Sequence, residues 1–216
     1  PLDPDGWHND GTYLDTLNPD AVAEFLRITH DQYAARYGEH FGGLVPAMFT
    51  DEPEYGPTHY RPVPGITGFT WTAALPEAFA ARRGYDLIDH LPEMVFRTHG
   101  REFSPVRYDY RRTVTELFEE AFSRQYGQWC ADHNLAMTGH YNAEQSLQFQ
   151  TRCTGSVMVH YQHQQWPGID ILTDQCDELL TAKQCSSVAD QLGKPRVLSE
   201  MYGCTGWDWP LGRHKY

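Results

Sequence analysis

Three short segments of the chain run from apolar residues directly into acidic ones. Each joins a predicted strand to one or two carboxylates: residues 44–49 to Asp51 and Glu52, residues 135–138 to Glu144, and residues 196–198 to Glu200. In parallel α/β sheets and barrels, ligands bind outside the carboxyl ends of the strands. The pattern therefore predicts that several strands deliver their carboxylates to one acidic active site.

Glu52 and Glu200 are the candidate catalytic pair. Hydrolysis of a glycosidic bond needs one carboxylic acid to protonate the leaving oxygen, and a second carboxylate on the opposite face of the sugar as base or nucleophile. The two glutamates are 148 positions apart (200 − 52), so only the fold can bring them together. The acid needs a raised pKa while its partner stays ionised, and the sequence leaves open which glutamate is which.

Pro53 directly follows Glu52 and restricts its backbone. Because the residue before a proline is disfavoured in the helical region, we expect Glu52 to be extended and its carboxylate to have little freedom. The alternative is that residues 51–53 form an ordinary turn. Glu200 follows an apolar strand, where a charge is costly unless it is paired, hydrogen-bonded or used in chemistry.

Further polar and aromatic residues near the strand ends are candidates for substrate binding. Aromatic rings suit the apolar C–H faces of sugars, while imidazole and carboxylates can bind hydroxyl groups. The candidates are Asp51, His140, Tyr141, Glu144, Asp170, Tyr202 and Trp207. Each also has a structural alternative, because a histidine can be a hydrogen-bonded core residue, an aspartate a buried cap, and an aromatic ring plain core packing.

Metal and nucleotide motifs are absent from the sequence. His160 and His163 match neither HExxH nor zinc-finger spacing, and there is no EF-hand loop, GxSxG, P-loop or GxGxxG. Carboxylates such as Asp51, Glu52 and Glu144 could instead hold a hard, oxygen-seeking ion such as calcium, and Glu144 is the candidate metal ligand. A metal-dependent hydrolase would need a histidine to meet a carboxylate around one ion.

Composition narrows the classes of partner. The chain has 216 residues, 40% hydrophobic and 13% aromatic, which is enough to bury a core. A net charge of −12 without a basic cluster disfavours nucleic acid and anionic membranes as partners. No apolar run approaches the roughly 18 residues that span a bilayer. Five cysteines without a CxxC pair favour reduced thiols, which leans towards the cytoplasm.

Strand and helix patterns alternate along the chain, which predicts βαβ units and a parallel sheet. We expect strands at residues 44–49, 135–138, 169–172 and 196–198, and helices at residues 19–37, 76–83, 86–91, 105–133 and 178–192. Residues 146–166 stay ambiguous. A (β/α)8 TIM barrel takes about 250 residues, so we expect residues 1–216 to be an excised part of one catalytic barrel, truncated at both ends and holding roughly strands 4 to 7. An open doubly wound sheet is the competing architecture.

Five motifs spread over most of the chain resemble one known family. They are FTDEP at residues 49–53, residues 79–87, Gly139-His140-Tyr141 with Glu144, PGID at residues 167–170, and LSEMYG at residues 198–203. They resemble the α-L-rhamnosidase-like proteins around glycoside hydrolase family 106. The resemblance implies a (β/α)8 catalytic barrel within a larger, multidomain bacterial enzyme that is inverting and calcium-assisted, and it allows a periplasmic or secreted location.

Carried onto this chain, the resemblance makes Glu52 the general acid and Glu200 the base, with Glu144 and Asp51 as site or metal residues. Their placement on strands 4 and 7 also resembles retaining glycosidases, so the stereochemical outcome stays open. We therefore expect a glycoside hydrolase that acts on plant or microbial polysaccharide. We also expect it to need the rest of its own chain for activity. The alternatives are a non-catalytic sugar-binding module, with exposed aromatic residues and splayed carboxylates, and a metal-dependent hydrolase.

Overall fold

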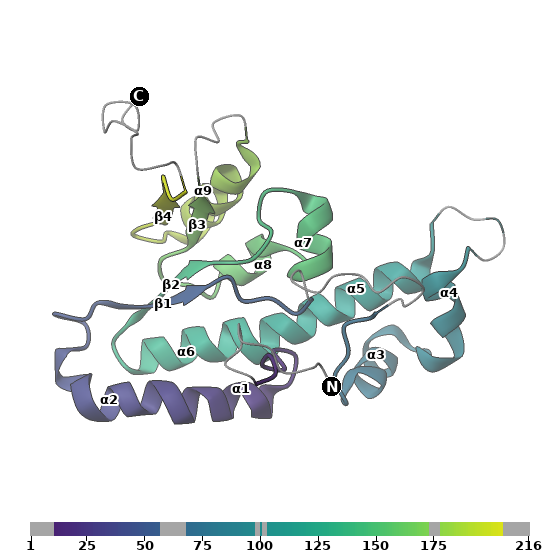
Figure 1. Ribbon diagram of the computed structural model, residues 1–216, viewed down its shortest axis with the longest axis horizontal. Coiled ribbons are helices and arrows are strands. Elements are labelled where there is room, and N and C mark those ends of the chain that lie inside the picture. Colours follow the sequence, from purple (N-terminus) through teal and green to yellow (C-terminus); the bar gives the residue numbers. More distant parts are fainter. Residues whose placement is uncertain (1–10, 57–67, 98–99, 101–102, 173–177, 205–216) are drawn as a thin grey trace.

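The computed structural model describes residues 11–56, 68–97, 100, 103–172 and 178–204, and helices alternate with short strands within them (Figure 1). The strands are β1 (Ala47–Asp51), β2 (Ala136–His140), β3 (Gly168–Ile171) and β4 (Leu198–Met201). β1 pairs with β2 and β3 pairs with β4, both in parallel. The described residues thus establish a mixed α/β architecture built from parallel strand pairs.

Helices cover one side of these strands. In Figure 1 the long helix formed by α5, η5 and α6 lies between the α1–α2 helix and the strands β1 and β2. The helical elements are α1 (Pro19–Phe25), η2 (Leu26–His30), α2 (Asp31–Tyr37), η3 (Gly38–His40), α3 (Leu75–Arg83), η4 (Ile88–His90), α4 (Leu91–Val95), α5 (Pro105–Phe118), η5 (Glu119–Arg124), α6 (Gln125–Asp132), α7 (Leu147–Cys153), α8 (Val157–Tyr161) and α9 (Leu180–Leu192).

Several helix boundaries follow from local chemistry. The side chain of Asn18 accepts hydrogen bonds from two backbone N–H groups of α1 and so caps its N-terminus. Gly84 and Gly193 end α3 and α9 in the left-handed conformation, with φ of 82° and 61°. The helix expected at residues 86–91 is instead the short η4 followed by α4, which continues to Val95. Pro92 lies in the first turn of α4, where its missing N–H has no intrahelical partner to lose.

Three of the four strands lie further along the chain than the apolar pattern predicted. β1, β2 and β4 extend two or three residues beyond the predicted ends at residues 49, 138 and 198. Apolar runs locate the buried part of a strand, whereas backbone pairing continues into the polar residues that follow. Pro46 lies before β1, and its carbonyl oxygen accepts the N–H of Ala136 at 3.0 Å. Asp51, His140 and Glu200 therefore lie within strands.

The junction between β2 and β3 is closed by side chains. A Cβ on Gly168 would come within 2.4 Å of the Gly139 carbonyl oxygen, so the two strands approach closely. Three side-chain bonds cross the junction: Met137 N–H to Gln165 Oε1 (2.7 Å), Gln164 Nε2–H to the Gly139 carbonyl (2.9 Å), and Asp170 N–H to Glu144 Oε1 (3.1 Å). We call this set the β2–β3 seam. It brings the carboxyl ends of the two strands side by side.

The hydrophobic core lies between the strands and the long helix. Met137 of β2 is fully buried, as are Val114 and Phe118 of α5. On the other face of the strands, Phe49 of β1 remains 44% exposed. Within the part of the chain that the structure describes, no helix is long and apolar enough to cross a membrane.

The described cysteines carry free thiols. Cys130, Cys153 and Cys185 are buried, and Cys204 is exposed. Burial raises the pKa of the Cys153 thiol to about 11, which disfavours the reactive thiolate. Cys176 lies outside the described residues.

Candidate active site

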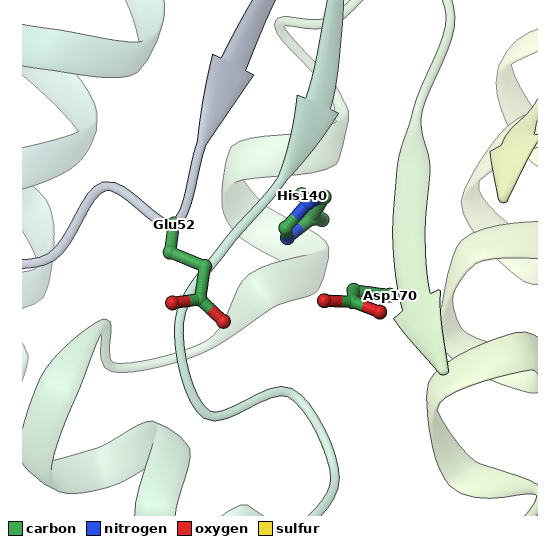
Figure 2. A group of neighbouring side chains, drawn as sticks. All are labelled: Glu52, His140 and Asp170. Atoms are coloured by element: carbon green, nitrogen blue, oxygen red, sulfur yellow. The ribbon is translucent and has the colours of Figure 1, made fainter. Parts of the chain in front are cut away.

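Polar side chains from several strands converge at one edge of the structure. The parallel register sets Asp51 of β1 opposite His140 of β2, and Asp170 of β3 opposite Glu200 of β4. Glu52 follows β1 directly. Figure 2 shows Glu52, His140 and Asp170 pointing toward one another, and one ligand atom of each lies within 4.8 Å of the others. Carboxylates from distant parts of the sequence thus share one location.

His140 joins the carboxylates of the outer strands. Its ring is 1% exposed, and its Nε2 lies 3.0 Å from Glu200 Oε2 and 3.4 Å from Asp51 Oδ1. Because both neighbours are acceptors, the tautomer that fits carries its proton on Nε2. The Phe49 ring packs edge-on against the imidazole, with ring centroids 5.5 Å apart. His140 is therefore a buried residue that orients two partly exposed carboxylates.

The carboxyl group of Asp170 has a raised pKa. Burial raises the pKa of its carboxyl to about 6, while His140 opposes the rise and Glu200 and Glu52 add to it. Among the described residues its Oδ1 is buried and has no hydrogen-bond partner. A buried carboxyl oxygen that points into a polar cluster is suited to bind a hydroxyl group or a cation.

The backbone is strained where three of the strands end. Glu52 has φ of 45°, Ala143 63° and Tyr202 69°, and each follows a strand by one to three residues. The expectation that Pro53 keeps Glu52 extended was wrong, because Glu52 lies in the left-handed region. Non-glycine residues in this region cost about 1–3 kcal/mol each and gather at functional sites, where the surrounding structure holds them.

Glu144 and Tyr141 lie beneath the site. Both are 1% exposed. One Glu144 oxygen accepts the Asp170 N–H, and the other accepts the Tyr161 hydroxyl. Burial raises the pKa of Glu144 to about 8, against these hydrogen bonds, which lower it. The two oxygens are engaged away from the cluster of Glu52, His140 and Asp170.

A chain of hydrogen bonds anchors Tyr141 from below. The Tyr141 hydroxyl donates to Ser123 Oγ at 2.9 Å, and Ser123 Oγ lies 2.9 Å from His160 Nδ1. His160 Nε2 lies 2.8 Å from the Thr154 carbonyl oxygen, which can only accept. Nε2 therefore carries the proton and Nδ1 accepts from Ser123. The π-helical segment η5 places Ser123 on the face of the long helix that makes this contact.

The cluster offers mixed ligands for a metal ion. Glu52 and Asp170 supply carboxylate oxygens, and His140 supplies a ring nitrogen. Calcium takes six to eight oxygen ligands, so the two carboxylates fit it and the imidazole does not. Since His140 Nε2 is already bonded to Glu200, the oxygen donors are the part of this group that suits a hard cation.

The comparisons with known proteins identify the family. The α-L-rhamnosidase family profile of glycoside hydrolase family 106 matches residues 3–210. The chain belongs to the α-L-rhamnosidase family. A solved structure, the rhamnosidase from Novosphingobium sp. PP1Y, has a TM-score of 0.64 and 22% sequence identity over 88% of this chain. The chain spans only 17% of that protein. No curated protein sequence matches significantly.

Most of the predicted site residues of this α-L-rhamnosidase family member come together. Glu52, Glu200, Asp51, His140 and Asp170 lie at the common edge, whereas Tyr141 and Glu144 are sealed beneath it. The described cysteine, histidine, aspartate and glutamate residues form no metal group that includes Glu144. Tyr202 directly follows β4 and is 38% exposed. Trp207 and Trp209 lie outside the described residues.

Sequence reasoning missed Glu54 at the same strand end. Its side chain is buried, and Glu54 Oε2 accepts the Asn142 Nδ2–H at 2.8 Å. Its carbonyl oxygen accepts the Thr16 hydroxyl at 2.8 Å. The repeated carboxylates of Asp51, Glu52 and Glu54 around Pro53 are the signal that could have revealed it.

His160 makes the layer beneath the site sensitive to acid. Burial lowers its pKa from 6.5 to about 4, so between these values the unfolded chain binds a proton that the folded protein does not. The stability from neutral His160 is therefore complete above pH 6.5 and is lost as the pH falls towards 4. Within that window the free energy of unfolding should fall by up to about 1.4 kcal/mol per pH unit.

The variant His160→Gln lacks this group, and its stability should depend less steeply on pH. Urea unfolding of both proteins at about pH 7 and pH 5 measures the difference, in which all other titrating groups cancel. Equal losses in the two proteins would contradict the assignment.

Proposed function

We propose that the protein is a glycoside hydrolase that cleaves α-L-rhamnosides from plant or microbial polysaccharide. The observation that supports this proposal most strongly is that carboxylates from separate strands meet around His140. The chain also belongs to the α-L-rhamnosidase family. Because the chain spans 17% of the solved rhamnosidase it matches, the activity of the whole protein is part of this proposal. The proposal also includes the carbohydrate substrate and the contribution of the rest of the chain to activity.

A catalytic (β/α)8 barrel is the architecture we propose around this site. Parallel β1–β2 and β3–β4 pairs follow the chain in order, and the seam joins the pairs. Asp51, His140, Asp170 and Glu200 occupy the carboxyl edge of these strands, where barrel enzymes place their catalytic residues. Phe49 of β1 packs on His140 and is still 44% exposed, as expected if further strands complete the barrel interior around it.

The strand order suggests how a sugar would lie. Glu52 comes from the end of β1 and Glu200 from β4, while His140 and Asp170 come from the strands between them. A sugar bound over His140 and Asp170 would therefore be flanked by the two glutamates. In this proposal Glu52 is the general acid that protonates the leaving oxygen, and Glu200 is the base that activates water.

The remaining residues of the edge bind and orient. His140 Nε2–H donates to Glu200 and holds it as an acceptor, the state that a base requires. Asp170 Oδ1, buried and without a described partner, binds a sugar hydroxyl directly or through a cation. Asp51 and Tyr202 lie nearer to solvent and contact the outer part of the substrate. Inversion is the outcome that we carry over from the family resemblance.

Substitution of the glutamates tests the proposed roles in the full-length protein. We expect Glu52→Gln and Glu200→Gln each to lower kcat on 4-nitrophenyl α-L-rhamnopyranoside by about 10²–10⁴-fold, the usual contribution of general acid–base catalysis. Glu54→Gln is the matched comparison, since it removes a neighbouring carboxylate. A larger loss in Glu54→Gln than in Glu52→Gln would move the acid role to Glu54. Sugar binding without turnover by the wild type would favour a binding module.

Calcium is the cofactor we propose for this edge, with Asp170 as its side-chain ligand. Glu52 is left out of this ligand set, because a carboxylate that binds a cation cannot also carry the proton that the leaving oxygen needs. Bound calcium would supply positive charge that fixes sugar hydroxyls. We expect treatment with EDTA to lower kcat/KM and added calcium chloride to restore it, and Asp170→Asn to weaken the response. Turnover that is unchanged after EDTA treatment, with metal content measured by atomic emission, would remove calcium from the account.

A further inference from the structure

Glu144 is sealed off from any substrate yet is bonded to the strand that carries Asp170. Its side chain is 1% exposed. Glu144 Oε1 accepts the Asp170 backbone N–H at 3.1 Å, and Glu144 Oε2 accepts the hydroxyl of Tyr161 from α8. The carbonyl oxygen of Glu144 accepts Gln150 Nε2–H of α7 at 2.7 Å. The carboxyl group of Glu144 is therefore held between α8 and β3, and its backbone is held by α7.

The Glu144 carboxyl group accepts a backbone N–H of β3 that a neighbouring strand would otherwise bind. β4 pairs with one edge of β3. On the other edge β2 ends at His140, and the Glu144 side chain supplies the acceptor for the N–H of Asp170. A backbone N–H fixes the position of its own Cα, and the Asp170 carboxyl projects from that Cα into the cluster with His140 and Glu52.

We propose that Glu144 is a positioning residue that holds Asp170 beside His140 through the Asp170 backbone N–H, and that it contacts neither substrate nor metal. The inference rests on the proposed function, because it assigns Glu144 to the support of that site. It differs from the substrate-binding and metal-ligating roles that the sequence suggested, which need an accessible carboxylate.

The chemistry of the amide separates these roles. In Glu144→Gln, Oε1 can still accept the Asp170 N–H, and Nε2 can donate to the Tyr161 hydroxyl oxygen. A positioning role therefore survives this substitution, whereas a catalytic acid or a charged metal ligand does not. Glu144→Met keeps a similar volume but removes both acceptors, so the Asp170 N–H loses its partner.

The experiment compares these variants in the full-length protein. We expect Glu144→Gln to keep kcat within threefold of the wild type and Glu144→Met to lose at least tenfold in kcat. In the Asp170→Asn background, Glu144→Met should lower kcat by less than a further threefold, because it acts through Asp170. Tyr110→Phe of α5 is the control, since it removes a part-buried hydrogen bond from the Tyr110 hydroxyl to the Thr70 carbonyl oxygen. Its kcat should not change.

A second readout does not depend on activity. Hydrogen–deuterium exchange of the peptide spanning residues 168–171 should be at least tenfold faster in Glu144→Met and unchanged in Glu144→Gln. If Glu144→Met does not fold, Tyr161→Phe takes its place, with a smaller increase in exchange expected.

Any of three results would overturn the inference. They are an equal loss of kcat in Glu144→Gln and Glu144→Met, unchanged hydrogen exchange in Glu144→Met, and a loss of kcat from Glu144→Met that is as large in the Asp170→Asn background as in the wild type. Failure of the proposed function is distinct, since it would show as no rhamnoside turnover by the wild type while the exchange result still decides the role of Glu144.

Discussion

The close approach of β2 and β3 is the constraint on which the site depends. Gly139 and Gly168 allow it, because a side chain on Gly168 would collide with the Gly139 carbonyl. Gln164, Gln165 and Glu144 then satisfy backbone groups that a continuous strand ladder would otherwise pair. Unpaired buried backbone groups cost about 1–3 kcal/mol each, so the side-chain bonds are what makes this junction stable.

The same junction gathers exposed acidic groups around one buried carboxyl group, that of Asp170. Asp170 is desolvated and faces Glu200 across the strand register, while His140 lies between the carboxylates of β1 and β4. The imidazole, with two carboxylate oxygens near its Nε2, orients these carboxylates. The left-handed backbone at Glu52 and Tyr202 also costs folding free energy, which the surrounding packing offsets. Such an arrangement is suited to chemistry that needs acids in different protonation states.

Much of this edge could be predicted from the sequence. Apolar runs that lead into Asp51, Glu52 and Glu200 located the strands to within three residues at their carboxyl ends. Parallel strands deliver these ends to one place. The helix caps at Asn18 and Gly84 could also be predicted, because each depends only on a few neighbouring residues. The family motifs added the link to α-L-rhamnosidases, which the family match confirms.

The seam could not be predicted in this way. Gln164 and Gln165 lie in a glutamine-rich stretch without strand or helix period, and each bonds a backbone group at least 25 positions away. Glu144 seemed a site residue because it follows β2, yet Tyr161 draws it into the interior. The left-handed backbone of Glu52 likewise depends on tertiary context. Long-range bonds between side chain and backbone leave no periodic trace in a single sequence.

A crystal structure of the full-length protein with L-rhamnose bound would show directly whether this edge binds the sugar between the two glutamates. We expect the sugar to lie over His140 and Asp170, with a hydroxyl bound by Asp170 directly or through calcium. Glu52 and Glu200 should flank it with their carboxyl groups about 6.5–9.5 Å apart, the spacing of inverting enzymes. A sugar bound elsewhere, or Glu52 and Glu200 on the same side of it, would rule out these two glutamates as acid and base.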